Sequence, residues 1–347
     1  MEVIFENFFS TLHWSVLALI IVVILLILGR AADWLVGEAV VLSERFHLPK
    51  VVIGATVVSL GTTMPEAAVS VLAAIQGSPG LALGNAVGSI ICDTGLILGL
   101  ACVIAPLKLD RKILNRQGWI QLGAAVALVA GTFPWRSSDT VFSLGGRLPQ
   151  FVGVVFLAAL VFYLYDLIVC GRERFDANVV SNRSEGSLVS NILVVARLLG
   201  AIAVVVVSAR VLIPAVTEGA LRLNVPPGII AATLVAFGTS VPELVTAVTA
   251  ARRGHGDLAV GNIVGADVLN VLFVAGAAAA ITPGGLVAEG HFFKVLFPFM
   301  LLILMIFRIT ILTSGQWMKR PFGFVLLAAY VLYILVSYIV PGDGAKL

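Results

Sequence analysis

The sequence predicts an all-α integral membrane protein whose ten transmembrane helices form two inverted five-helix repeats. Three observations support this prediction. Of the 347 residues, 60% are hydrophobic and only 12% are charged, about half the charge of an average soluble domain. The apolar stretches run for about 20 residues, the length that a helix needs to cross the hydrocarbon layer. One stretch of sequence also recurs later in the chain.

Ten apolar segments are long enough to be considered as spans. We place them at 14–42, 50–75, 81–105, 117–133, 149–170, 190–217, 227–251, 257–282, 292–313 and 322–341. The longest polar interval, around 171–190, separates the fifth segment from the sixth. The chain therefore divides into a first five-helix repeat (1–170), a linker on the cytoplasmic side (171–190) and a second five-helix repeat (191–347).

The distribution of basic residues predicts the orientation. Loops after the first, third, fifth, seventh and ninth spans carry thirteen Lys and Arg residues, whereas the opposite side carries five. Basic loops stay in the cytoplasm. We therefore expect a multi-pass protein of the cell (plasma or inner) membrane with both termini outside the cytoplasm.

Composition and motifs also exclude some functions. A net charge of +3 without a basic arm argues against nucleic-acid binding. We find no His-Glu-x-x-His motif and no nucleophile–base pair, so we expect no enzymatic activity. The three cysteines have no metal-ligand spacing and are read as buried apolar residues. We expect a monomer whose partners are inorganic cations and the lipid bilayer, with no cofactor.

An internal duplication carries most of the functional information. Residues 55–106 align without a gap onto 232–283, and 21 of the 52 pairs are identical. The repeat motifs extend over 51–106 and 228–283, and each contains a Gly-Thr-x-x-Pro-Glu block followed by a Gly-Asn block. Because the copies begin five spans apart, they enter the membrane from opposite sides. Inverted repeats of this kind are common in secondary transporters, although duplication also builds channels and structural bundles.

Each copy places a glutamate, Glu66 or Glu243, about 16 residues into a span. A charge at the centre of a span costs roughly 2.5–3.5 kcal/mol on insertion scales. Neither copy has a basic residue within its helices that would form a structural ion pair. We therefore expect a cation from solution to be the partner of both carboxylates.

Oxygen atoms surround both glutamates in the sequence. A Gly and a Pro bracket each block, so the helix is expected to break there and to free carbonyl groups. The candidate ligands are the hydroxyls of Thr62, Thr63, Thr239 and Ser240 and the carbonyls near Ser59 and Ala236.

On the next helix, Asn85, Ser89 and Asp93 recur every four residues and form a polar stripe, matched in the second copy by Asn262, Ala266 and Asn270. Asp267 is an additional acid beside the stripe. It is expected to face the cavity, pair with an intramembrane Arg, or titrate.

Together these residues form an all-oxygen site without Cys or His, which suits Ca²⁺ or Na⁺ and argues against Zn²⁺ and Cu⁺. Three carboxylates can neutralise one Ca²⁺ or two to three Na⁺. Competition for the same charges would then couple the two ions, which would be transported rather than kept as cofactors.

The two blocks resemble the α-repeats of the calcium/cation antiporter superfamily, especially those of the sodium/calcium exchangers and their prokaryotic relatives. The pattern is close to G-T-S-x-P-E followed by G-N-x-x-G-S-N-x-x-[DN], and this chain has it at 61–66 with 84–93 and at 238–243 with 261–270. The resemblance implies a central Ca²⁺ site on Glu66 and Glu243, flanked by Na⁺ sites on the hydroxyls, Asp93, Asn270 and carbonyls. It also implies that the first helix of each half slides during gating.

Four residues depart from the pattern. Ile90 and Asp267 replace Asn, Ala266 replaces Ser, and Thr63 replaces Ser. The missing hydroxyl at Ala266 affects one Na⁺ site, and Asp267 leaves room for proton coupling. The leading hypothesis is a secondary antiporter that exchanges Ca²⁺ for Na⁺ by alternating access. A Ca²⁺ (or other cation)/H⁺ antiporter of the same fold is the alternative, and a passive cation channel is a different class.

Overall fold

The computed structural model describes residues 8–136, 138–176, 188–223 and 236–340. The described part is almost entirely helical, with two short two-stranded ladders. Seven of its helices are long and apolar enough to cross a membrane, and a bent pair would make an eighth. The prediction of an all-α membrane protein is therefore confirmed at this level.

The elements of the first half follow the expected spans. They are α2 (Trp14–Arg45), α3 (Lys50–Ile53), the π-helical turn η1 (Gly54–Val58), α4 (Ser59–Thr62), α5 (Met64–Ile75), α6 (Pro79–Ile91), the π-helical turn η2 (Cys92–Ile97), α7 (Leu98–Ile104), β1 (Leu107–Lys108), α8 (Arg111–Thr132), the short 3₁₀ helix η3 (Ser138–Thr140), α9 (Val141–Leu144), β2 (Gly146–Leu148) and α10 (Gln150–Asp176).

The described elements of the second half begin at residue 188. They are α11 (Leu188–Arg222), α13 (Ala236–Gly238), α14 (Val241–Arg252), α15 (Gly256–Leu269), the π-helical turn η5 (Asn270–Ala275), α16 (Gly276–Ile281), β3 (Leu286–Ala288), the π-helical turn η6 (Phe292–Leu296), α17 (Phe297–Thr313), β4 (Trp317–Met318) and α18 (Arg320–Ile339).

Two expected spans differ from the helices that were found. The short segment 117–133 belongs to the longer helix α8, which begins at Arg111 and whose first turns are charged. The segment 227–251 is described only from residue 236, and much of the expected linker 171–190 lies outside the described residues.

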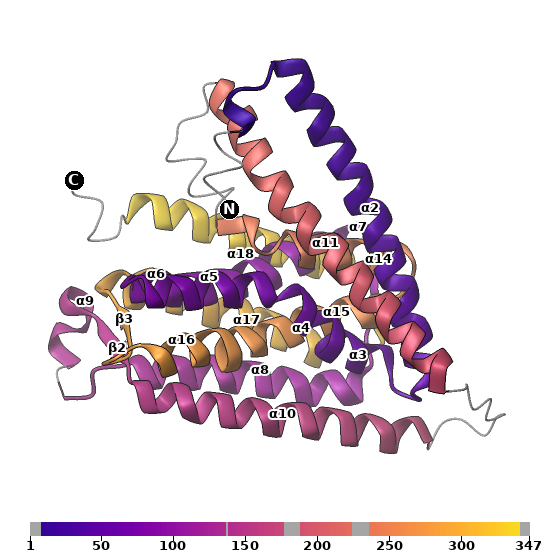
Figure 1. The fold of residues 1–347 in the computed structure, drawn as a ribbon. Helices are drawn as coiled ribbons and strands as arrows, with labels where there is room; N and C mark the ends of the chain where they lie inside the picture. The colour runs from indigo at the N-terminus through magenta and orange to yellow at the C-terminus, as the bar shows by residue number, and fades with distance from the viewer. Residues whose placement is uncertain (1–7, 137, 177–187, 224–235, 341–347) are drawn as a thin grey trace.

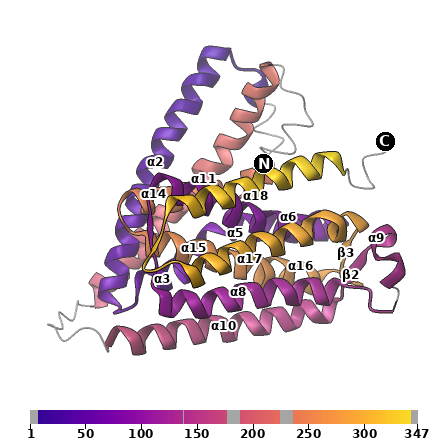
Figure 2. The ribbon, with the colours of Figure 1, turned by 180° about the vertical axis from the view of Figure 1, so that it is seen from behind.

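The long helices α2 and α11 lie side by side and are steeply inclined to the other helices, as both views show (Figures 1 and 2). They are the first helices of the two halves. Most of the remaining long helices run alongside one another, and α8 and α10 cover one side of that group. The two halves are therefore not separate domains, because their first helices are packed together.

The loops meet at two opposite ends of the molecule. At one end, β1 pairs antiparallel with β4, and the Lys50 Nζ lies 3.2 Å from the His255 Nδ1. At the other end, β2 pairs antiparallel with β3. Loops after the first, third, seventh and ninth expected spans thus share one end, which agrees with the alternation used to count the basic residues.

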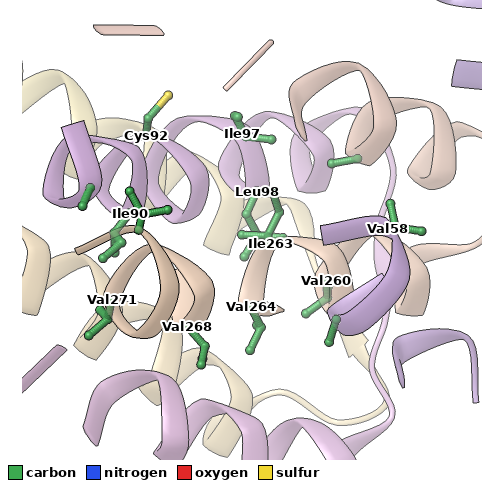
Figure 3. Packing of buried hydrophobic residues seen from close by; sticks show 14 of the residues in the cluster. Val58, Ile90, Cys92, Ile97, Leu98, Val260, Ile263, Val264, Val268 and Val271 are labelled. Carbon is green, nitrogen blue, oxygen red and sulfur yellow. The ribbon is translucent and has the colours of Figure 1, made fainter. Parts of the chain in front are cut away.

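Helix α15 occupies the centre of the core. Its residues from Leu258 to Leu269 are all buried. Figure 3 shows its valines and Ile263 near Val58 of η1 and near Ile97 and Leu98 of η2 and α7. Glycines permit this close approach: a Cβ on Gly261 would lie 2.3 Å from the Val51 carbonyl oxygen, and one on Gly265 would lie 2.5 Å from the Ala55 Cα. The Gly-x-x-x-Gly step of the second repeat therefore seats α15 on the first repeat.

Candidate functional site

The first Gly-Thr-x-x-Pro-Glu block breaks its helix where the sequence predicts. Helix α4 ends at Thr62, α5 begins at Met64, and the two helical segments meet at an angle of 44°. Pro65 lies in the first turn of α5, where its missing N–H costs no intrahelical bond. This break brings Glu66 to the first turn of a new helix, near the positive end of its dipole.

The second block repeats this arrangement. Helix α13 ends at Gly238, α14 begins at Val241, and Pro242 and Glu243 lie in its first turn. Both glutamates are about 1% exposed. Two buried carboxyl groups thus stand at equivalent helix N-termini, one in each repeat.

The two blocks exchange hydroxyl contacts. The Thr63 hydroxyl donates to Glu243 Oε1 at 3.4 Å, and the Ser240 hydroxyl donates to Glu66 Oε1 at 3.4 Å. Thr63 and Ser240 occupy the same position in the two motifs, three residues before the glutamate. The symmetric exchange joins the repeats at the centre of the molecule and assembles one site from both halves.

Asn85 extends the site from α6. Its amide nitrogen donates to the Glu66 carbonyl oxygen at 3.2 Å and to the Ser70 hydroxyl at 3.0 Å. Its amide oxygen accepts from the Thr239 hydroxyl at 3.5 Å. Asn85 thereby fixes α5 to α6 next to the carboxylate and also contacts the second repeat.

Many of the expected ligand atoms are buried without a hydrogen-bond partner in the described part of the chain. They are Glu66 Oε2, Glu243 Oε2, Asp93 Oδ1, Ser89 Oγ, Asn262 Oδ1 and Asn270 Oδ1; the amide nitrogens of Asn262 and Asn270, which cannot ligate a cation, have no partner there either. A buried oxygen with no partner is costly. Oxygens gathered from equivalent positions of two repeats therefore fit a bound cation as their missing partner.

Carboxylates alone do not make a metal site. The anionic forms of Glu66, Glu243 and Asp93 repel one another. Among the described residues, no three His, Cys, Asp or Glu side chains lie close enough together to hold a metal ion by themselves. Hydroxyl, amide and carbonyl oxygens would have to complete the coordination, as expected for Ca²⁺ or Na⁺.

Thr62 and Ser59, two of the expected ligands, make hydrogen bonds within the helix that precedes the break. The Thr62 hydroxyl donates to the Val58 carbonyl of its own helix at 3.2 Å. The Ser59 carbonyl, expected to be freed by the break, accepts the Thr63 N–H at 2.8 Å, because α4 keeps its hydrogen bonding up to the bend. The same carbonyl also lies 3.4 Å from the Thr62 hydroxyl, which can donate to it as well. Ala236, its counterpart, begins α13.

The polar stripe ends in π-helical turns. Asp93 lies in η2 and Asn270 opens η5, at equivalent places in the two repeats. Such turns are rare and often occur at functional sites, since the extra residue leaves the backbone hydrogen-bond ladder locally irregular. Both residues are about 1% exposed.

Asp267 is held by two residues that sequence reasoning did not select. The Thr94 hydroxyl and the Gln121 amide nitrogen both donate to Asp267 Oδ2 at 2.5 Å, while Asp267 Oδ1 has no partner in the described part. Pairing with an arginine, one of the three expectations, is not found among the described residues. Gln121 was discernible in the sequence as an amide inside a span, but nothing indicated its partner.

The buried arginine of the membrane region lies elsewhere. Arg308 donates to the Asn115 carbonyl at 3.0 Å and to its side-chain oxygen at 2.5 Å, and its guanidinium stacks on Trp119. In the described part, the salt bridges join Arg116 to Asp166, Arg222 to Glu218 and Arg253 to Asp33. None of them reaches the central carboxylates.

Comparisons with known proteins identify a family. The family model for the sodium/calcium exchanger protein matches residues 16–169 and, separately, residues 193–339. The chain is 31% identical to the sodium/calcium exchanger MaX1 of Methanosarcina acetivorans over 92% of this chain and 98% of that protein. It is 33% identical to the inner membrane protein YrbG of Escherichia coli over 92% and 96% of the two chains.

Solved structures agree. The fold is similar to that of the sodium-calcium exchanger NCX_Mj soaked with 10 mM Na⁺ and zero Ca²⁺, with a TM-score of 0.77 and 26% identity over 92% of this chain and 98% of that one. The same exchanger soaked with 10 mM Na⁺ and 10 mM Sr²⁺ gives a TM-score of 0.76 and 27% identity, over 93% and 99%.

Proposed function

We propose, from the premise that this chain belongs to the sodium/calcium exchanger protein family, that it is a secondary antiporter exchanging Ca²⁺ for Na⁺ by alternating access. Cation exchange is the activity named for its relatives. For this chain, the choice of Na⁺ as counter-ion and the alternating-access mechanism are our proposal.

One observation carries the proposal: the two repeats contribute buried, unsatisfied oxygens to one place. Glu66 and Glu243 each accept a hydroxyl from the opposite block and keep a second oxygen without a partner in the described residues. A cation between them would satisfy both carboxylates and offset the cost of burying them. The proposed ligands are those expected from the sequence, with Glu66, Glu243 and Asp93 supplying the charge.

The proposed architecture is ten spans in two inverted five-helix repeats, divided at the linker 171–190. Support comes from the two separate matches of the family model, one in each half. The sharing of one molecular end by loops after odd-numbered spans also supports it. Equivalent breaks at Thr63 and at Thr239–Ser240 support a two-fold relation between the halves.

Alternating access would use the inclined pair α2 and α11. A Cβ on Gly61 would lie 2.7 Å from Ile202, and one on Gly238 would lie 2.9 Å from Ile213, both on α11. The first glycine of each motif is thus covered by the same helix. Sliding of α11, together with α2, would change the cover over both breaks and expose the site to one side at a time.

The test is calcium flux into proteoliposomes at matched internal and external pH. We expect an outward Na⁺ gradient to drive uptake of radiolabelled calcium uphill. Glu66→Gln and Glu243→Gln should each abolish this uptake, because the amide keeps the size of the side chain but not its charge. Uphill calcium uptake that is indifferent to Na⁺ would refute the proposed exchange, and flux that never runs uphill would indicate a channel.

The alternative counter-ion is H⁺, and Asp267 is the residue that favours it. Its carboxyl is about 2% exposed, and no basic residue pairs with it in the described part. If protons are the counter-ion, a pH gradient alone should drive calcium uptake, and Asp267→Asn should remove that response. If Na⁺ is the counter-ion, as we propose, Asp267→Asn should retain sodium-driven uptake.

A further inference from the structure

A pocket away from the central site opens between α2 and α14. It has a volume of about 430 Å³ and is lined by Leu25, Leu26, Gly29, Arg30, Asp33, Thr249, Arg252 and Arg253. Its volume is in the range of ordinary small-molecule sites. The expected cation ligands are absent from its lining, so it is a separate feature.

The pocket carries a net positive charge, because three arginines line it with one aspartate. Arg253 Nε pairs with Asp33 Oδ1 at 3.0 Å, and Arg253 Nη1 donates to the Asp33 carbonyl at 2.9 Å. This pair links the C-cap residue of α14 to α2 and neutralises one arginine. Arg30 and Arg252 make no hydrogen bond or ion pair with other described residues. Two cationic groups are therefore left facing an open pocket.

The other wall of the pocket is apolar and is formed by residues of α2 about one helical turn before Arg30. Leu25 and Leu26 are 51% and 66% exposed, and a Cβ on Gly29 would meet no described atom within 4 Å. Leu26 and Arg30 are four residues apart, so they lie on the same face of α2. The pocket therefore offers an apolar wall followed by a cationic one, as an amphiphile requires.

The cationic part lies at the depth of the lipid headgroups. Nine residues separate Glu243 from Arg252 on α14, which at about 1.5 Å per residue is roughly 14 Å. This is about half of the ~30 Å hydrocarbon layer. A site near the midplane thus puts Arg252 at the membrane surface, at the end where Lys50 and His255 meet.

We propose that this pocket binds an anionic phospholipid, with the phosphate on Arg30 and Arg252 and an acyl chain along Leu25 and Leu26. Basic pockets between transmembrane helices commonly bind anionic headgroups. The exposed leucines favour a lipid over a soluble phosphate. Since α2 is one of the two inclined helices and α14 carries Glu243, a lipid bridging them couples the membrane composition to the transport cycle.

The test is lipid binding to the purified full-length protein, measured by native mass spectrometry during titration with phosphatidylglycerol. The variant carries Arg30→Gln and Arg252→Gln. The control carries Lys112→Gln and Lys319→Gln, which remove the same charge from exposed positions outside the pocket. We expect the pocket variant to bind the tightest lipid roughly 30-fold more weakly, since each of the two basic residues contributes about fivefold to the affinity. The control should bind as the wild type does.

Two outcomes would overturn the proposal. Either the pocket variant binds phosphatidylglycerol as tightly as the wild type, or both variants weaken binding equally, which would indicate general charge attraction. The same titration is repeated with soluble glycerol phosphate as a competitor. If glycerol phosphate displaces phosphatidylglycerol at a concentration similar to that of the lipid, the site binds a free phosphate instead of a lipid. A thermal melt of each variant verifies folding, and the binding readout is independent of whether calcium is exchanged for sodium.

Discussion

Thr63 and Ser240 occupy the third position of the two Gly-Thr-x-x-Pro-Glu blocks and supply the hydroxyls that connect the two halves of the candidate site. Thr63 and Ser240 each reach the glutamate of the other repeat, so each glutamate is oriented by the half to which it does not belong. A hydrogen bond to a charged group contributes about 1.5–3 kcal/mol. These contacts at 3.4 Å are long and belong at the lower end of that range.

Removing either hydroxyl should therefore weaken cation binding without unfolding the protein. For Thr63→Ala and for Ser240→Ala we expect a roughly tenfold rise in the calcium concentration that gives half-maximal flux. Thr63→Ser keeps the hydroxyl and should stay near wild type. Thr246→Val is the matched control, because the buried Thr246 hydroxyl donates only to the Pro242 carbonyl of its own helix. Equal effects of Thr63→Ala and Thr246→Val would contradict a role in orienting Glu243.

At the scale of elements, α15 is the helix on which the site rests. It carries Asn262 and Asp267 and leads into Asn270, and its glycines bring it against η1 and α4 of the first repeat. A Cβ on Gly265 would lie 2.5 Å from the Ala55 Cα and 2.7 Å from the Ser59 Oγ. Two backbones meet there, so no side-chain rotation can make room.

Gly265→Ala should consequently destabilise the protein. Overpacking of this kind costs about 1–3 kcal/mol, and the shift of Ser59 should also lower the calcium affinity. Gly123→Ala on α8 is the control, because a Cβ there meets no described atom within 4 Å and Ala favours the helix. The measurement is the thermal unfolding midpoint of both variants in the same detergent. A midpoint for Gly265→Ala that is unchanged or raised would show that α15 can move away from η1.

The elements show how far sequence reasoning extends. The break before Glu66 was predictable because proline removes a backbone donor, whatever the surroundings. The polar stripe on α6 was predictable because helical periodicity depends only on spacing. The hydroxyl of Thr94 and the amide of Gln121 were not, because their contacts with Asp267 depend on how η2 and α8, respectively, pack against α15.

The same limit applies to the backbone. The freed carbonyl expected near Ser59 is bonded by the Thr63 N–H, since the helix bends at Thr63 and stays hydrogen-bonded up to that residue. The π-helical turns at Asp93 and Asn270 were also not expected. A single extra residue in a turn costs little locally and is selected by tertiary packing, so neither composition nor spacing reveals it.

At the scale of the whole molecule, the two copies of the repeated sequence differ in charge. The first repeat has a carboxylate at Asp93 where the second has an amide at Asn270, and both lie in π-helical turns at about 1% exposure. If one two-fold axis relates the halves and the cations lie near it, the site needs one carboxylate at this pair of positions. Cation binding should then depend less on whether the first or the second repeat provides that carboxylate.

Exchanging the two residues tests that symmetry. Asp93→Asn alone should weaken sodium binding about 10- to 100-fold, because a charged ligand becomes neutral. Adding Asn270→Asp should restore at least half of the lost binding free energy. Restoration should stay incomplete, since the new carboxylate lies three residues from Asp267 on the same helical face and like charges at that spacing repel. The measurement is the sodium concentration for half-maximal calcium exchange in the single and double variants. A double variant no better than Asp93→Asn would place the cations off the axis, nearer to the first repeat.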